Sequence, residues 1–228
     1  MVRHTSHYYD SRPPRPRRHF IIKMDIRGQF LEFASSSGVF SKDKVDLGTI
    51  VLIDSLELPD SGEVLDMGCG YGAIGIAIAK LYPSLKVTMV DVNPAAVKLV
   101  RENIVRNYVQ NAEALQSDLY RMLEGRSFDA IVSNPPLAAG YKTIFPMIEG
   151  AYTHLKDGGF LQIVLRKGIN AIPRKMEGVF KNVTTVSKKS GYRVFKSSKI
   201  PAEDAERGIA TTDGEKAKKY PPPFDREV

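Results

Sequence analysis

Residues 64–72 read Val-Leu-Asp-Met-Gly-Cys-Gly-Tyr-Gly, an apolar run that continues into a glycine-rich segment. The short apolar run 64–67 is typical of a strand buried on both faces. The glycines that follow predict a tight turn, and a helical pattern begins directly after them. Glycines in such a turn let a ligand approach the backbone, while the first turn of a helix offers free N–H groups. We therefore expect a ligand-binding turn between a strand and a helix.

Two kinds of ligand fit the glycine pattern. Residues 70–75 match the dinucleotide pattern G-x-G-x-x-G, and Asp91 follows Gly70 by 21 residues, close to the position of a ribose-binding acid. Asp66 argues against a dinucleotide, because its carboxylate would repel a pyrophosphate. S-adenosylmethionine (SAM) carries an ammonium and a sulfonium, so an acid at this place favours SAM over a nicotinamide cofactor. A third interpretation is that the glycines only tighten the turn.

The surrounding sequence alternates between strand and helix patterns, which indicates a parallel α/β sheet. Further strands are expected at 86–90, 112–116, 128–133 and 160–165. Apolar residues at helical spacing predict two crossover helices. They are Val97, Val100, Ile104 and Tyr108 in one, and Ile144, Ile148, Ala151 and Leu155 in the other. Asn93-Pro94 is typical of a helix start.

Hairpins are expected on both sides of this unit. Residues 20–25 and 29–34 flank Arg27-Gly28, and residues 183–187 and 192–196 flank Ser190-Gly191. The second hairpin would close the sheet as an antiparallel edge. We expect a flexible basic arm at 1–19, a catalytic domain at 20–200 whose first part, 20–45, is hairpin and entry segment, and a mobile charged tail at 201–228.

Composition limits the protein class. The 228 residues carry 33 Lys and Arg against 26 Asp and Glu, a net charge of +7, with 43% hydrophobic residues. This is a globular composition, and no apolar run approaches the roughly 20 residues of a membrane helix. One cysteine, Cys69, excludes an intramolecular disulfide. We expect a cytoplasmic protein without a metal site, and the basic charge is compatible with a polyanionic partner.

Residues 134–137, Asn-Pro-Pro-Leu, follow the expected strand 128–133 at the edge where α/β sheets bind ligands. The lone pair of an exocyclic amine on a base is delocalised into the ring. Two acceptors on its N–H groups, the Asn134 side-chain oxygen and the Pro135 carbonyl, can direct that lone pair toward a methyl group. No separate general base is needed. Taken alone, Asn134-Pro135-Pro136 is also compatible with a plain turn.

These motifs resemble those of class I SAM-dependent methyltransferases. Asp66 with its glycines resembles motif I, Asp91 motif II, and Asn134-Pro135-Pro136 motif IV of the amino-methyltransferases. Residues 37–41 and 45–49 resemble the entry signature of ribosomal small-subunit guanine-N2 methyltransferases and of their small archaeal relatives. The resemblance covers about 33–199, and it implies a Rossmann-like, seven-stranded, mostly parallel sheet with helices on both faces. Leu137 departs from the aromatic residue that is usual in the adenine and glutamine branches.

The resemblance also implies roles for individual residues. Catalysis would rest on Asn134 and Pro135. The cofactor would be bound by Thr49, Asp66, Gly68, Cys69, Gly70, Asp91, Val92, Asp118 and Asn134. The substrate would be bound by Phe40, Ser41, Pro136, Leu137, Arg166, Lys167 and Arg193. Three other interpretations stay open: Asp118 as a helix cap, Phe40 as a core residue, and Asp46 with Thr49 as a helix start.

The basic charge is concentrated. Residues 166–199 hold ten Lys or Arg and one Glu, a net charge of +9, and residues 1–27 carry +5. We interpret residues 166–199 as an RNA-binding face, with a solvated surface as the alternative. Tyr141 and Tyr192 are candidates for base stacking, or core residues.

The sequence thus predicts methyl transfer from SAM to an exocyclic amine of RNA, with guanine N2 of ribosomal RNA as the first candidate. The alternatives are a protein glutamine-N5 methyltransferase, an adenine-N6 methyltransferase, and a non-catalytic RNA-binding factor. The glutamine enzymes would be expected to carry a tyrosine at position 137. A factor without activity would be free to lose Asp66, Asp91 and Asn134.

Overall fold

The computed structural model describes residues 19–36, 45–135 and 140–201. The elements are β1 (His19–Ile26), β2 (Gln29–Ser36), α1 (Leu47–Asp54), β3 (Gly62–Met67), α2 (Ala73–Leu81), β4 (Leu85–Asp91), α3 (Pro94–Arg106), β5 (Ala112–Gln116), β6 (Phe128–Ser133), α4 (Tyr141–His154), β7 (Leu155–Leu165), α5 (Ala171–Phe180), β8 (Thr184–Lys189) and β9 (Tyr192–Ser198).

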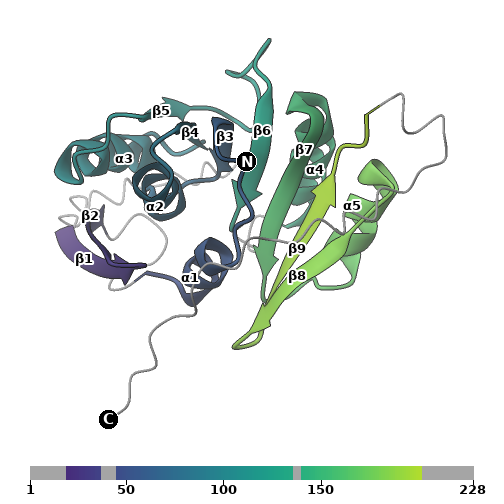
Figure 1. Cartoon of the computed structure of the whole chain (residues 1–228), viewed down its shortest axis with the longest axis horizontal. Coiled ribbons are helices and arrows are strands. Elements are labelled where there is room, and N and C mark those ends of the chain that lie inside the picture. Colours follow the sequence, from purple (N-terminus) through teal and green to yellow (C-terminus); the bar gives the residue numbers. More distant parts are fainter. Residues whose placement is uncertain (1–18, 37–44, 136–139, 202–228) are drawn as a thin grey trace, which may run out of the picture.

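Seven strands form one sheet in the order β5-β4-β3-β6-β7-β9-β8 (Figure 1). The pairings from β5 through to β7 are parallel, and β9 lies antiparallel between β7 and β8. This confirms the expected sheet and its antiparallel edge. The strand order reverses between β3 and β6, and a crevice at the carboxyl ends of such a pair is where open α/β sheets bind ligands.

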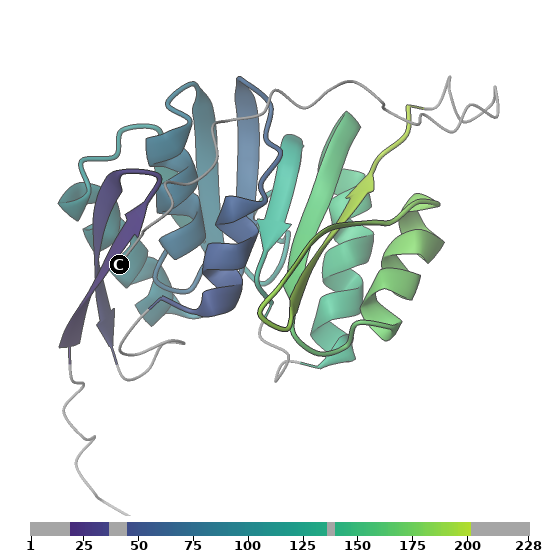
Figure 2. The same ribbon diagram turned by 60° about the horizontal axis from the view of Figure 1, so that its bottom comes forward.

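Helices cover both faces of the sheet, as expected (Figures 1 and 2). The buried side chains of α2 and α3 belong to one hydrophobic core together with those of α1 and the hairpin. The buried side chains of α4 and α5 form a second core on the other face. Successive side chains of β3 point to opposite faces of the sheet, so Val64 lies in the first core and Leu65 in the second.

The N-terminal hairpin β1–β2 packs on α2 and α3 (Figure 2). Ile22, Met24 and Phe33 are buried in the first core. The Asn103 side chain accepts from Ala34 N at 2.7 Å and donates to Ala34 O at 3.0 Å and to Tyr71 O at 2.9 Å. One buried amide of α3 therefore joins the hairpin to the glycine turn.

Three boundaries differ from the prediction. Leu155 begins β7 opposite Phe128 instead of ending α4, because pairing in the sheet buries its side chain as completely as the helix face would. Tyr108 lies beyond α3 with a φ of 52° and is exposed, since the helix ends at Arg106. β1 begins at His19, inside the range expected for the arm. The rest of the arm and the tail after Pro201 lie outside the described residues, so those domain limits stay predictions.

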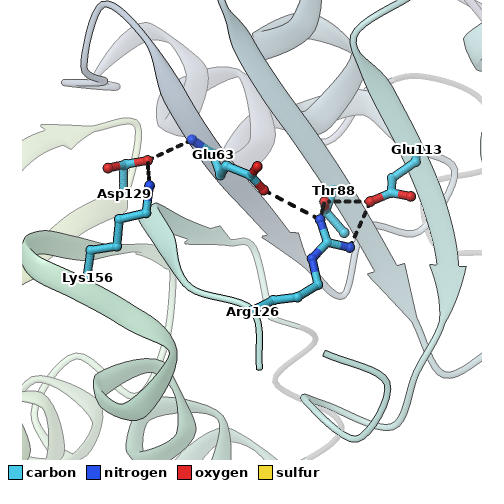
Figure 3. Close-up of polar contacts among 6 residues, drawn as sticks. All are labelled: Glu63, Thr88, Glu113, Arg126, Asp129 and Lys156. Atoms are coloured by element: carbon cyan, nitrogen blue, oxygen red, sulfur yellow. Dashed lines mark hydrogen bonds and ion pairs between the residues drawn. The ribbon is translucent and has the colours of Figure 1, made fainter. Parts of the chain in front are cut away.

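A polar network ties the amino ends of the central strands together (Figure 3). The Arg126 guanidinium contacts Glu113 at 2.8 Å, Thr88 Oγ1 at 2.8 Å and Glu63 at 3.5 Å. Asp129 accepts from Glu63 N and from Lys156 Nζ, each at 2.7 Å. These charges lie at the edge opposite the glycine turn, so we assign them to the stability of the sheet.

Candidate active site

The glycine turn connects β3 to α2 and requires residues without a side chain. Gly68 and Gly70 adopt φ values of 74° and 58°, in the left-handed region that other residues rarely enter. Gly68 N and Cys69 N both donate to Val90 O, at 2.9 and 3.0 Å. The turn between a strand and a helix is as predicted, and these contacts attach it to the end of the neighbouring strand β4.

Asp91 ends β4 beside this turn. Its Oδ2 accepts from Gly70 N at 2.9 Å, and its Oδ1 accepts from Asn93 N at 2.9 Å. A carboxylate oxygen accepts more than one hydrogen bond, so each oxygen retains capacity for a hydroxyl. The two backbone contacts hold the carboxylate at the rim of the pocket, where the two hydroxyls of a ribose could bind.

Asp66 is buried, with an exposed fraction of 1%. Its Oδ2 accepts from Gly75 N at 2.9 Å, whereas its Oδ1 has no hydrogen-bond partner among the described residues. Burial raises the pKa of Asp66 to about 7, against the lowering effect of the Gly75 hydrogen bond. A buried carboxyl oxygen without a partner is rare in folded proteins and needs a compensating donor or cation.

A cavity of about 310 Å³ opens at the carboxyl ends of β3, β4 and β6. Its volume lies at the lower end of the range for small-molecule sites. It is lined by Asp46, Thr49, Met67, Gly68, Cys69, Gly70, Tyr71, Ala73, Ile74, Val90, Asp91, Val92, Asn93, Ala96, Ser117, Asp118, Leu119, Ser133, Asn134, Pro135, Thr143, Ile144 and Met147. Asp66 is not in this lining, so it lies behind the turn rather than in the wall of the cavity.

Most residues expected to bind a cofactor meet at this cavity. Thr49, Asp91, Val92 and Asp118 line it together with the glycine turn and Asn134. The helix-cap interpretation of Asp118 is wrong, because residues 117–127 form turns and no helix follows. Burial raises the pKa of the Cys69 thiol. The thiol is therefore protonated near neutral pH, which fits a lining residue and not a nucleophile.

Asn134 follows β6 and reaches across to the segment before α1. Its Nδ2 donates to Asp46 Oδ2 at 2.9 Å and to Thr49 Oγ1 at 3.1 Å. Ser133 Oγ donates to Met67 O at 2.8 Å and fixes the end of β6 against β3. With both amide hydrogens bound, the side-chain oxygen of Asn134 is available as an acceptor. Pro135 is buried beside it in the wall of the cavity.

Asp46 is a pocket residue, whereas the sequence predicts it only as part of a helix start. It does cap α1, because its Oδ2 accepts from Gly48 N at 2.9 Å. It also accepts from Asn134 and, through Oδ1, from the Tyr192 hydroxyl at 3.3 Å. These two partners lie 88 and 146 positions away along the chain, so no local pattern could have found them.

The basic residues expected to bind substrate lie beside the cavity and not in its lining. Arg166 and Lys167 are exposed after β7. The Arg166 guanidinium stands 5.8 Å from the centre of the Tyr192 ring. Arg193, in β9, pairs with Leu165 of β7. Arg166 is connected to the pocket through Tyr192, whose hydroxyl donates to Asp46.

The remaining substrate candidates are not placed. Phe40, Ser41, Pro136 and Leu137 lie outside the described residues, so their expected roles stay predictions. Tyr141 begins α4 and stacks on Phe145, with ring centres 5.1 Å apart. No cluster of three metal-ligating side chains occurs in 19–36, 45–135 or 140–201. Across the same ranges, no helix is long and apolar enough to cross a membrane.

The arrangement fits a cationic cofactor with a ribose. Asp91 can accept from ribose hydroxyls, and the glycine turn leaves its backbone accessible. Asp66 places behind the turn a carboxyl oxygen that no donor within the described ranges contacts. Asn134 and Pro135 line the same cavity. The pocket can therefore hold SAM and bring a second, amine-bearing molecule to Asn134.

Comparisons with known sequences agree with this geometry. Residues 30–196 match the methyltransferase small domain family. The chain is 38% identical over 200 residues to the uncharacterized protein YbxB of Bacillus subtilis, covering 86% of this chain and all of that protein. It is 40% identical over 164 residues to the ribosomal RNA small subunit methyltransferase C of Aeromonas hydrophila. That match covers 70% of this chain and 47% of the relative, so the chain spans about half the length of the methyltransferase C relatives.

A solved structure is similar at the level of the fold and the sequence. It is the Thermus thermophilus 16S rRNA N2 G1207 methyltransferase in complex with AdoMet and guanosine. The TM-score is 0.72 with 30% identity, and the match covers 82% of this chain and 52% of that chain. These relatives are bacterial, so the expected archaeal relationship finds no support among them.

Proposed function

The chain belongs to the methyltransferase small domain family, and on that premise we propose that it methylates an exocyclic amine of RNA, guanine N2 of ribosomal RNA. It is a class I methyltransferase with SAM as its cofactor. The observation that carries the proposal is the Asn134 amide, whose hydrogens are bound to Asp46 and Thr49 while its oxygen is available beside the cavity.

The residues of the chain would act by orientation. The Asn134 side-chain oxygen and the Pro135 carbonyl would accept the two N–H groups of the target amine and direct its lone pair toward the cofactor. When bound, SAM would supply an electrophilic methyl group, its sulfonium becoming a neutral thioether as the methyl group passes to the amine nitrogen. The methylated nitrogen would then release one proton to water. No general base is required of the protein.

Residue roles in cofactor binding form part of the proposal. Asp91 would accept from the ribose hydroxyls, and Val92, at the pocket rim, would contact the adenine. Asp118 would accept from the adenine amino group. Gly68, Cys69 and Gly70 would hold the methionine portion, with Thr49 near its end and Asp66 acting on its ammonium from behind the turn. Because Thr49 already accepts from Asn134, it would serve both the cofactor and the catalytic amide.

Ribosomal RNA is supported over other substrates by two observations. The methyltransferase C relatives are named for ribosomal RNA, and the Thermus structure contains guanosine. Exposed Arg166 and Lys167 stand beside the pocket, where they would bind phosphates near an extruded base. Phe40, Ser41, Pro136, Leu137 and Arg193 are proposed to contact the substrate.

Labelled-methyl transfer to a panel of acceptors tests the proposal. The purified chain and labelled SAM would be incubated with unmodified 16S rRNA, unmodified tRNA and a release factor, each in parallel. We expect label in the rRNA and none in the release factor. Label confined to protein would replace the proposal with a glutamine-N5 activity. Binding of RNA with no transfer to any acceptor would favour the non-catalytic factor.

A further inference from the structure

The Asp46 carboxylate joins three separate parts of the chain at the pocket. Its Oδ2 accepts from Gly48 N and from Asn134 Nδ2, both at 2.9 Å, and its Oδ1 accepts from the Tyr192 hydroxyl at 3.3 Å. These donors belong to the start of α1, the segment after β6, and the start of β9. A helix cap needs only the first of these contacts, so the other two require a different explanation.

The contact to Asn134 determines which way its amide points. A carboxylate can only accept, so the amide nitrogen must face Asp46, and Thr49 Oγ1 takes the second amide hydrogen at 3.1 Å. Rotating the amide by half a turn would bring its oxygen against the Asp46 carboxylate and would break the hydrogen bond to Asp46, whereas the Thr49 hydroxyl could bind either orientation. The Asn134 oxygen is therefore held in one orientation, away from Asp46 and at the cavity.

The packing around Asp46 is close on its other side. A Cβ added to Gly48 would stand 2.6 Å from Tyr192 Cε1 and 2.7 Å from Asp46 Oδ2. The absence of a side chain at position 48 thus allows the Tyr192 ring to approach the carboxylate. The Arg166 guanidinium covers the same ring at 5.8 Å. Asp46 is held from both sides, as a group that fixes the geometry of another residue should be.

We propose that Asp46 is a positioning residue for methyl transfer, which orients the Asn134 amide so that its oxygen meets the target amine, with Tyr192 holding the carboxylate. This rests on the proposed function, because it assigns the Asn134 oxygen to the amine. Asp46 itself touches neither the amine nor the transferred methyl group. Its removal should lower the rate of the transfer step and leave the binding of both substrates largely intact.

Asp46→Ser separates this role from helix capping. Serine is as good an N-cap as aspartate, so its hydroxyl can keep the contact with Gly48 N. Asparagine would not separate the two roles, because Oδ2 of Asp46 accepts from both Gly48 N and Asn134 Nδ2, and an amide oxygen in its place could keep both contacts. The serine side chain is shorter and has one oxygen, so it cannot also accept from both Asn134 and Tyr192. With 16S rRNA and SAM, we expect kcat to fall by about tenfold or more, because an interaction used in the transition state is removed. KM for the RNA and the calorimetric Kd for SAM should change by less than about threefold.

Two further variants serve as a weaker change at the same site and as a control. Tyr192→Phe removes only the hydroxyl contact, so kcat should fall by a smaller factor, about two- to fivefold. Asp60→Ser makes the same chemical change at an exposed position between α1 and β3 and should leave kcat unchanged. The melting temperature of each variant shows whether the fold is retained.

An NMR spectrum of the Asn134 side-chain amide gives a readout that needs no RNA. Its signal is assigned by its disappearance in Asn134→Ala. In the native chain its two protons should exchange slowly with water, and in Asp46→Ser they should shift and exchange faster. Unchanged kcat or an unchanged amide signal in Asp46→Ser would overturn the proposal. So would a loss of SAM affinity with normal kcat at saturation. If the native chain methylates no RNA, the proposed function fails, and the amide signal still decides the role of Asp46.

Discussion

The carboxylates of Asp66 and Asp91, both near the glycine turn, differ in their surroundings. Asp91 accepts from two backbone N–H groups at the rim of the cavity. Asp66 is enclosed, and one of its oxygens has no partner in the described part of the chain. The two acids are therefore suited to different tasks, with Asp91 binding neutral hydroxyls and Asp66 favouring a positive charge nearby.

The raised pKa of Asp66 predicts a pH-dependent stability. Its pKa is about 7 in the folded chain and 3.8 as a free side chain, so the folded state binds the proton more tightly. The stability that this group contributes is complete below about pH 4 and is lost as pH rises toward 7, a change of at most about 4 kcal/mol. In Asp66→Asn, the free energy of unfolding from urea titrations should decrease less between pH 5 and 8 than in the native chain. Parallel pH profiles for the two proteins would contradict the assignment.

The position of Asp91 predicts its contribution to cofactor affinity. Asp91→Ala removes the acceptor for both ribose hydroxyls, so SAM binding should weaken by about 1–3 kcal/mol in titration calorimetry. The substitution also frees Gly70 N and Asn93 N, and the melting temperature must therefore be measured alongside. Glu113→Ala, on the adjacent strand but at the opposite edge, is the control and should bind SAM normally. Native affinity in Asp91→Ala would remove the residue from the cofactor site.

At the scale of elements, α3 connects the hairpin to the active site. Asn103 and Asn107, one turn apart, each hydrogen-bond to both backbone groups of a residue in β2. Asn103 also binds Tyr71 O in the glycine turn. The hairpin is therefore positioned by polar contacts as well as by its apolar face.

Removing the buried amide should destabilise this connection. Asn103→Ala leaves Ala34 N, Ala34 O and Tyr71 O without their partner, at a cost of about 2–4 kcal/mol. The measurement is the free energy of unfolding in urea, compared with Asn170→Ala, an exposed asparagine whose side chain makes no capping bond to α5. A decrease below about 0.5 kcal/mol would mean that water replaces the amide.

Local sequence patterns were enough to predict the helices and strands. They could not predict contacts between residues that are far apart in the sequence. The strand at 128–133 and the start of α3 at Pro94 follow from apolar runs and from Asn93 as a cap, which are local signals. Asp91 and Asn134 could be identified because each belongs to a sequence motif that lies at the end of an expected strand. Asp46 was not recognised as a pocket residue, since its role depends on Asn134 and Tyr192, which only the sheet order brings to it. Asp66 was expected to act on the cofactor, and its burial behind the turn could not be inferred from spacing.

At the scale of the whole molecule, the basic residues of segment 166–199 are distributed between the two ends of the strands. Arg166, Lys167, Lys188, Lys189 and Arg193 lie near the carboxyl end of β7, on the side of the pocket. Lys196 and Lys199 lie closer to the amino end of β7. Acids from other parts of the chain pair with four lysines of the segment: Lys175, Lys189, Lys196 and Lys199. The charge available to RNA near the pocket is thus smaller than +9, and it is centred on Arg166 and Lys167.

This distribution predicts which charges determine the salt dependence of RNA binding. Replacing Arg166 and Lys167 together by alanine should reduce the slope of log affinity against log salt by about 1.4, because each phosphate that is no longer neutralised contributes about 0.7. Lys175 and Lys199, both in ion pairs, provide a matched double alanine variant that should keep the native slope. Filter binding of 16S rRNA across a salt series measures both. Equal slopes for the two double variants would show that Arg166 and Lys167 do not bind phosphates.

We propose that Asn134 directs methyl transfer to guanine N2 of ribosomal RNA. The most direct measurement is nucleoside mass spectrometry of unmodified 16S rRNA after incubation with SAM and either the native chain or Asn134→Ala. We predict N2-methylguanosine with the native chain. Asn134→Ala should give none, while its calorimetric affinity for SAM stays close to native. A different methylated nucleoside, no methylated nucleoside, or full activity in Asn134→Ala would show that Asn134 does not direct methyl transfer to guanine N2.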